Sequence, residues 1–176
     1  MLGSPAPSLE LPIVGGGRRS LADLRGRPVM ISFLGPAHCN FCRSHIIRAI
    51  QHRDEFQQLG ADVIFVAYSD PQELMAKMLS DLELPYTLLI DPARESYRRW
   101  GLGEAGLREW FSPGMYAAMV KAVLRRDRLF KMSRGPVQLG GDFVVDRRGN
   151  VSFVNRLKNF HDRASMPDLL AALAAA

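Results

Sequence analysis

Short apolar runs alternate with longer amphipathic stretches along most of this chain. The apolar runs predict strands at residues 29–34, 62–68 and 86–90, and the hairpin connection at residues 146–150, which contains Gly149, predicts two further strands at 142–145 and 151–155. The amphipathic stretches predict helices at residues 42–59, from Asp70-Pro71 through Leu82, from Asp91-Pro92 to Trp100, and from Pro167 onward. The alternation of these elements predicts an α/β fold with a mixed sheet and helices on both faces.

Two segments do not follow this alternation. Residues 1–20 are rich in Pro and Gly, which predicts an extended arm or a small hairpin leading into the core. Residues 107–132 have a mostly helical pattern and many aromatic side chains. We therefore expect one domain over residues 1–176, with an N-terminal arm of about 1–27 and a helical insertion of about 101–140. The insertion is interpreted as a cover over the sheet, with a homodimer face or a substrate lid as alternatives.

The composition is that of an ordinary globular protein. The 176 residues suffice for one domain with a sizeable core, and 47% of them are hydrophobic. No stretch approaches the roughly 20 apolar residues that a membrane-spanning helix needs. Residues 1–12 lack the pattern of a secretory signal, and both cysteines lie in one motif. A cytoplasmic location is the expectation from these features.

The net charge of +5 is partly concentrated in one segment. Residues 121–134 carry six basic side chains and one acidic side chain: Lys121, Arg125, Arg126, Asp127, Arg128, Lys131 and Arg134. A solvated helix face explains such a segment, and an anionic partner or a membrane surface is the alternative. A nucleic-acid partner is not expected from this segment alone.

The candidate chemistry lies in Cys39-Asn40-Phe41-Cys42, which holds the only two cysteines of the chain. The motif follows a predicted buried strand and opens a predicted helix. Two thiols at this spacing can exchange electrons as a dithiol and a disulfide. A disulfide between them would close almost no loop and would add little stability. The motif therefore indicates a redox function.

The helix pattern suggests different roles for the two sulfurs. Cys42 lies four residues before Ile46 on the apolar face, so we expect it to be sheltered, whereas Cys39 precedes the first turn and is expected to be the more exposed, accessible sulfur. Cys39 is thus predicted to attack the substrate and Cys42 to resolve the mixed disulfide. Backbone N–H groups of the first turn, Arg43 and a protonated His38 are expected to lower the pKa of Cys39.

Metal binding is the alternative interpretation of the same segment. His38, Cys39, Cys42 and His45 place four nitrogen and sulfur donors within residues 38–45, a set that zinc or copper accepts. Structural zinc sites usually join two separated ligand pairs, and this chain has no second pair. His45 by itself is expected to be a partly exposed surface histidine. We predict no cofactor, and we keep metal binding as the alternative.

Several motifs give the chain a resemblance to a known family. They are the opening Pro5-Ala6-Pro7-Ser8-Leu9-Glu10-Leu11, the run Leu89-Ile90-Asp91-Pro92, the run from Leu139 to Asp146, and Phe160. With the Cys-x-x-Cys, the chain resembles peroxiredoxins of the alkyl hydroperoxide reductase/thiol-specific antioxidant superfamily. It is most similar to the Cys-x-x-Cys branch that includes relatives of prostamide/prostaglandin F synthase.

The resemblance implies a thioredoxin-like fold and an antioxidant enzyme. Such an enzyme is a thiol-disulfide oxidoreductase or a thiol-dependent peroxidase. Its substrate is a peroxide or a disulfide, and an external reductant of the thioredoxin or glutathione type restores the dithiol.

The family pattern also gives a second assignment of the two cysteines. Peroxiredoxins carry Pro-x-x-x-Thr/Ser-x-x-Cys, and in that register Cys42 is the sulfur that forms a sulfenic acid. Cys39 then occupies the Thr/Ser position and resolves the product, and Pro36 lies one residue out of register. Which cysteine attacks first stays open at this point.

Two other departures concern the approach to the late core strand. Peroxiredoxins place an Arg there, whereas the nearest one here is Arg134, so we expect an incomplete peroxide-activating set. Thioredoxins have a cis-Pro facing the dithiol, and this chain has Gly140-Gly141 instead. Since glycine permits close approach, we hypothesise that a substrate backbone or a ligand lies there against Cys39.

Overall fold

The computed structural model describes residues 1–105, 137–159 and 162–176. Its centre is a five-stranded sheet in which β3, β4 and β5 are parallel, while β8 runs antiparallel to both β3 and β9. In spatial order the strands are β5 (Thr87–Ile90), β4 (Asp62–Ala67), β3 (Val29–Phe33), β8 (Gly141–Val145) and β9 (Val151–Arg156). The predicted mixed sheet is confirmed.

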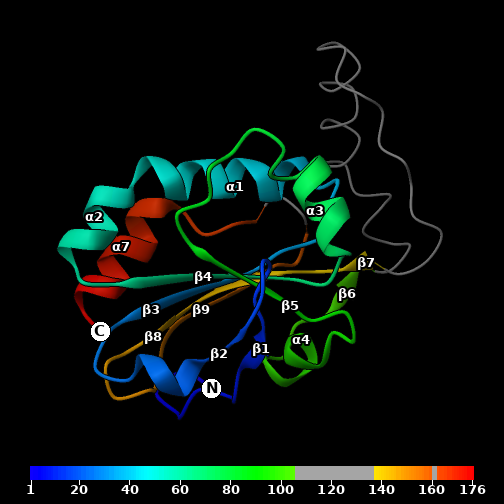
Figure 1. Ribbon diagram of the computed structural model, residues 1–176. Coiled ribbons are helices and arrows are strands. Elements are labelled where there is room, and N and C mark those ends of the chain that lie inside the picture. Colours follow the sequence, from blue (N-terminus) through cyan, green and yellow to red (C-terminus); the bar gives the residue numbers. More distant parts are fainter. Residues whose placement is uncertain (106–136, 160–161) are drawn as a thin grey trace.

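Helices cover both faces of this sheet (Figure 1). One face carries α1 (Asn40–Gln51), α2 (Arg53–Gln58), α3 (Pro71–Lys77) and α7 (Met166–Ala174). The other carries α4 (Glu95–Arg99), the 3-10 helix η1 (Leu21–Leu24) and the hairpin of β1 (Glu10–Pro12) and β2 (Arg18–Ser20). Alternate strand residues point to opposite faces, so Met30 joins the first apolar cluster and Ile31 joins the second.

Some predicted helix boundaries are wrong. The stretch 42–59 is two helices, which meet at His52. The next helix ends at Lys77 instead of continuing to Leu82. The third begins at Glu95 and not at Asp91, because the Asp91 carboxylate accepts hydrogen bonds from the first N–H groups of that helix while Arg94 turns the chain with a φ of 55°.

The predicted insertion at residues 101–140 begins and ends in strands. There β6 (Glu104–Ala105) pairs antiparallel with β7 (Val137–Gln138), where a helical segment is expected from the sequence. Residues 106–136, with the basic segment 121–134, lie outside the described residues, as do Phe160 and His161. The role of the insertion as a cover, a lid or a homodimer face stays a prediction.

The ends of β3 and β4 are held together by a buried tyrosine. The Tyr97 hydroxyl donates to the carbonyl of Leu34 at 2.8 Å and to that of Val66 at 2.9 Å. Phe33 packs edge-on against the Tyr97 ring, with 4.9 Å between the ring centroids. These contacts fix the end of β3, from which the Cys-x-x-Cys segment departs.

In the part of the chain that the structure describes, no helix has the length and apolarity to cross a membrane.

Gly140 allows a close contact between β3 and the segment that enters β8. A Cβ atom at Gly140 would lie 2.0 Å from the Phe33 carbonyl oxygen and 2.8 Å from Arg163 Nη2. At Gly141, a Cβ would lie 2.6 Å from a Leu102 methyl carbon. The protein's own atoms therefore fill the space beside both glycines, and the hypothesis of a ligand lying there against Cys39 is not supported.

We expect Gly140→Ala to lower the free energy of unfolding by about 1–3 kcal/mol or more, because the added methyl forces the Phe33 backbone away. Denaturant unfolding of the reduced protein measures this. Gly103→Ala is the matched control, since a Cβ there meets no atom within 4 Å. Equal stability of the two variants would contradict the explanation.

Candidate active site

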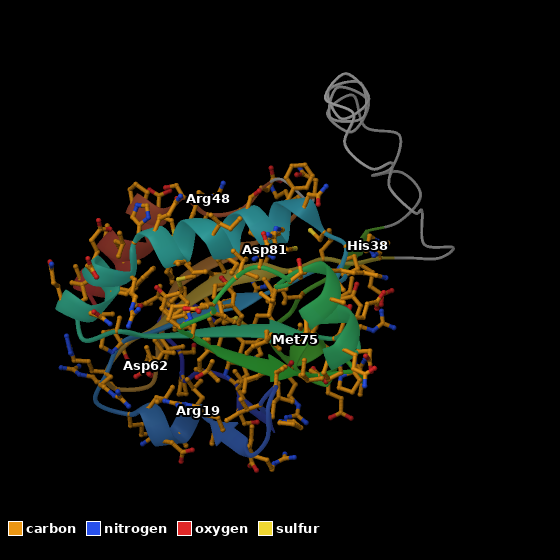
Figure 2. The ribbon with its side chains drawn as sticks, turned by 45° about the horizontal axis from the view of Figure 1, so that its top comes forward. Arg19, His38, Arg48, Asp62, Met75 and Asp81 are labelled. Carbon is orange, nitrogen blue, oxygen red and sulfur yellow. The ribbon has the colours of Figure 1, made fainter. Side chains whose placement is uncertain are left out.

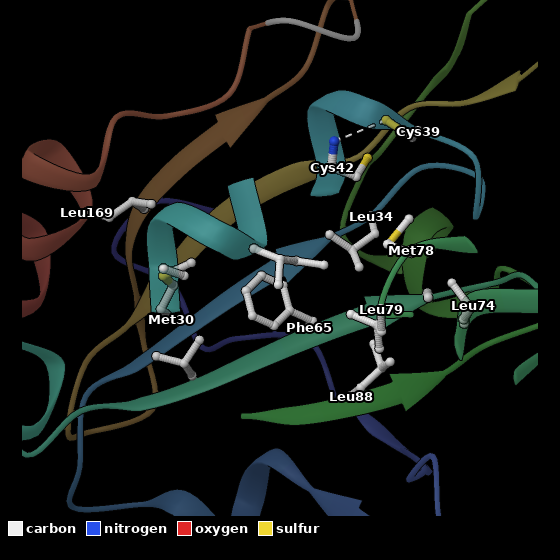
Figure 3. Close-up of a cluster of buried hydrophobic side chains, with 14 of the residues drawn as sticks. Met30, Leu34, Cys39, Cys42, Phe65, Leu74, Met78, Leu79, Leu88 and Leu169 are labelled. Carbon is white, nitrogen blue, oxygen red and sulfur yellow. Dashed lines mark hydrogen bonds between the residues drawn. The ribbon is translucent and has the colours of Figure 1, made fainter. Parts of the chain in front are cut away.

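The two cysteines lie where β3 ends and α1 begins. Cys39 is the N-cap of α1, and its sulfur accepts a hydrogen bond from the backbone N–H of Cys42 at 3.2 Å. Figure 3 shows both side chains at the end of the apolar cluster that contains Leu34 and Met78. Cys39 is 5% exposed and Cys42 is 3% exposed, and both are free thiols. Cys39 is the more exposed of the two, as predicted, but it is not accessible, because this residue caps the helix from inside the core.

Cys42 has the environment of a thiolate. The backbone N–H of Gly35 donates to its sulfur at 3.2 Å, and Arg163 Nη2 lies 3.7 Å away. A hydrogen bond from the Cys39 thiol outweighs the effect of burial and, with Arg163 and Gly35, lowers the pKa of Cys42 to about 6. Cys42 is thus mostly ionised at neutral pH.

Cys39 has the opposite environment. Its hydrogen bond to Cys42, burial and the negative charge of Cys42 raise the pKa of Cys39 well above that of an ordinary thiol. The expected lowering of its pKa is wrong, since these effects outweigh the hydrogen bond from the first turn of α1. The geometry pairs an anionic Cys42 with a protonated Cys39.

The other residues predicted to support the site have different partners. Arg43 donates to the Met78 carbonyl at 2.5 Å and to Asp81 at 2.7 Å, so α1 is tied to the segment after α3. The Pro36 carbonyl accepts the N–H of Cys39 at 2.9 Å and so shapes the turn before α1. His38 lies in that turn (Figure 2).

A buried polar network lies under the dithiol. His45 is fully buried, and its Nε2 lies 3.0 Å from Ser32 Oγ and 3.3 Å from Asp142 Oδ1. Burial lowers the pKa of His45 and favours its neutral form. The expectation of a surface histidine is therefore wrong. Spacing on α1 would have identified it, because His45 follows Cys42 by three residues and precedes Ala49 by four on the same face.

The structure does not support the metal alternative. Within residues 1–105, 137–159 and 162–176, no group of three or more His, Cys, Asp or Glu side chains is placed to hold a metal ion. Because His45 Nε2 faces Ser32 and Asp142, the four donors predicted from residues 38–45 do not converge on one metal site.

Arg163 is the residue of this site that sequence reasoning missed. It lies 121 residues after Cys42, beyond β9, and its side chain is 3% exposed. It provides a guanidinium at the dithiol, although the chain has no Arg just before β8. No local spacing pointed to Arg163, since only the antiparallel return of β9 brings it back to the end of β3.

Comparisons with known proteins give a consistent result. The model of the AhpC/TSA family matches residues 2–154. A protein of Mycobacterium tuberculosis that carries the name peroxiredoxin is 30% identical over 149 residues, which are 85% of this chain and 80% of that protein.

Solved structures show the same fold. The peroxidoxin BcpB of Mycobacterium tuberculosis superimposes with a TM-score of 0.70 at 20% identity, over 98% of this chain and 95% of that one. A protein of Chlorobium tepidum named as the thiol:disulfide interchange protein DsbE gives a TM-score of 0.63, also at 20% identity, over 97% and 96% of the two chains.

We expect thiolate to form on Cys42 with a midpoint near pH 6, and on Cys39 only well above pH 9, the range of an ordinary thiol. Below about pH 6 the fraction of ionised Cys42 falls roughly tenfold per pH unit. Ultraviolet absorbance of the reduced protein against pH measures this. Cys42→Ser must abolish the low-pH step, and a step that persists in this variant would assign the thiolate to Cys39.

Proposed function

The chain belongs to the AhpC/TSA family as a peroxiredoxin-like, thiol-dependent oxidoreductase, and from this premise we propose that Cys42 attacks the substrate while Cys39 resolves the product. The observation that carries the proposal is the hydrogen bonding of Cys42 Sγ by the Gly35 N–H, with the Arg163 guanidinium beside it. This is the assignment that follows the peroxiredoxin register, not the one in which Cys39 attacks first.

The first step is attack of the Cys42 thiolate on one oxygen of a hydroperoxide. The S–O bond forms as the O–O bond breaks, so Cys42 is oxidised to a sulfenic acid and the peroxide is reduced to an alcohol or water. The departing oxygen takes up a proton. Arg163 is well placed to stabilise the negative charge in this step, because its Nη2 is 3.7 Å from the attacking sulfur.

The second step is attack of Cys39 on the sulfenic sulfur of Cys42. A disulfide forms, and the sulfenic oxygen leaves as water. Both sulfurs lie beside Gly35, where a Cβ would be 3.4 Å from Cys42 Sγ and 3.7 Å from Cys39 Sγ, so they are already neighbours in the reduced protein. An external thiol reductant of the thioredoxin or glutathione type then reduces the disulfide by exchange and leaves as its own disulfide, and the enzyme returns to its starting state.

Burial of the dithiol favours a small substrate. With 5% and 3% of Cys39 and Cys42 exposed, a protein partner, whether a disulfide substrate or a thioredoxin-type reductant, reaches the sulfurs only after a rearrangement of the site. Hydrogen peroxide or a small organic hydroperoxide needs far less room. We therefore propose that a hydroperoxide oxidises Cys42, and that thiol-disulfide exchange occurs only when the external reductant reduces the Cys39–Cys42 disulfide.

Single cysteine variants test this assignment. The wild-type protein should lose two thiols for each peroxide and gain the Cys39–Cys42 disulfide. Cys42→Ser should react no faster than an ordinary free thiol. Cys39→Ser should lose one thiol and hold a sulfenic acid on Cys42, which mass spectrometry detects after trapping with a dione reagent. Rapid oxidation of Cys42→Ser, with Cys39→Ser inert, would reverse the roles.

A further inference from the structure

Asp142 lies at the centre of the buried network and has an unusually full set of donors. It is fully buried on β8. Its Oδ1 accepts from Ser32 Oγ at 2.7 Å and from Arg163 Nη1 at 2.7 Å, and lies 3.3 Å from His45 Nε2. Its Oδ2 accepts from the Ala164 N–H at 3.1 Å and from Asn155 Nδ2 at 3.5 Å. Burial alone would raise the pKa of Asp142, but Arg163, His45 and the hydrogen bonds lower it, so the carboxylate is charged.

The guanidinium of Arg163 is held at two points besides the sulfur. Nη1 donates to Asp142 Oδ1 and Nη2 donates to the Phe33 carbonyl, both at 2.7 Å. These two bonds lie on the two arms of a planar, rigid fork. Once both are made, the place of Nη2 beside Cys42 Sγ is fixed.

We propose that Asp142 is a positioning residue, which holds the Arg163 guanidinium where it stabilises the Cys42 thiolate. The inference rests on the proposed function only in taking Cys42 as the attacking sulfur. It assigns to a residue outside the Cys-x-x-Cys motif a part in setting the reactivity of that motif.

Because Asp142 is charged, the direction in which the pKa of Cys42 shifts when that charge is removed tests the proposal. An anion near Cys42 opposes ionisation of the thiol, so removing that charge must by itself lower the pKa of Cys42. If Arg163 is no longer held beside Cys42, the thiolate loses a stabilising cation and the pKa of Cys42 rises. A rise after neutralisation of Asp142 therefore cannot come from the lost charge itself and indicates displacement of Arg163, which the double variant checks.

The other titratable groups around the site do not obscure this measurement. Cys42 faces Cys39, Arg163, Tyr68 and Tyr97, and burial raises the pKa of both tyrosines above their ordinary value. Asp142 faces His45 and Arg163. Because the pKa of His45 is lowered, His45 is mostly uncharged above its ordinary value of about 6.5. Thiolate absorbance comes from sulfur and not from imidazole, so the titration reports on the cysteines below this pH as well.

The experiment compares the pKa of Cys42 in Asp142→Asn, Arg163→Gln and the double variant. Absorbance of the thiolate in the reduced full-length protein measures it, without peroxide. We expect Arg163→Gln to raise the pKa by about one pH unit or more, Asp142→Asn to raise it by a similar amount, and the double variant to rise no further. Asp146→Asn, in the turn after β8, is the matched control and should leave the pKa unchanged.

Each other outcome overturns the proposal. A fall in Asp142→Asn would make Asp142 an opposing charge only, and no change would make it a purely structural residue. An unchanged pKa in Arg163→Gln would remove the cation through which Asp142 acts. Failure of the cysteine assignment would instead appear in the peroxide reactions of Cys42→Ser and Cys39→Ser.

Arg163→Lys decides the matter should Asp142→Asn not fold. Lysine keeps the charge but cannot donate to Asp142, Phe33 and Cys42 from one fixed fork. A raised pKa of Cys42 in this variant supports positioning by the two anchor points. A wild-type pKa would show that charge alone suffices and would overturn the proposal.

Discussion

The arrangement of the site depends on one buried cation, the guanidinium of Arg163. It joins the carboxylate of Asp142 to the end of β3 and the sulfur of Cys42, two groups from a much earlier part of the chain. Removing one partner of a buried ion pair costs about 3–5 kcal/mol, although replacing both with well-packed apolar residues is often neutral. A buried pair is thus poor evidence for stability by itself. Its place beside a thiol with a lowered pKa is better explained by the chemistry of that thiol.

Much of the fold could be predicted from the sequence, because β3, β4 and β5 are short apolar runs and a hairpin connection separates β8 from β9. The Cys-x-x-Cys was placed correctly at the start of the helix that follows β3, since both elements have strong local patterns. Boundaries failed where side chains compete with local signals, as when the Asp91 carboxylate caps a helix that begins four residues later. The paired strands β6 and β7 were missed because their partners are far apart in the sequence.

The candidate site was predicted only in part, and for a similar reason. Local reasoning assigned the lowered pKa to Cys39, since it considered the helix N-terminus and the neighbouring residues His38 and Arg43. The groups that act on Cys42 come from outside α1, namely the Gly35 backbone and Arg163. Contacts that a sheet makes between residues 121 positions apart leave no trace in spacing or periodicity. The alternative register of the family pattern had suggested Cys42 on independent grounds.

Gly35 shows how a departure from the family motif can preserve the chemistry. In the register Pro-x-x-x-Thr/Ser-x-x-Cys that ends at Cys42, position 35 is that of the proline. Proline has no N–H, whereas Gly35 donates its N–H to Cys42 Sγ at 3.2 Å. A Cβ at Gly35 would also lie 3.4 Å from Cys42 Sγ and 3.7 Å from Cys39 Sγ, so glycine leaves that side of both sulfurs uncovered. The exchange thus adds a donor that stabilises the thiolate, and it keeps a side chain away from both sulfurs.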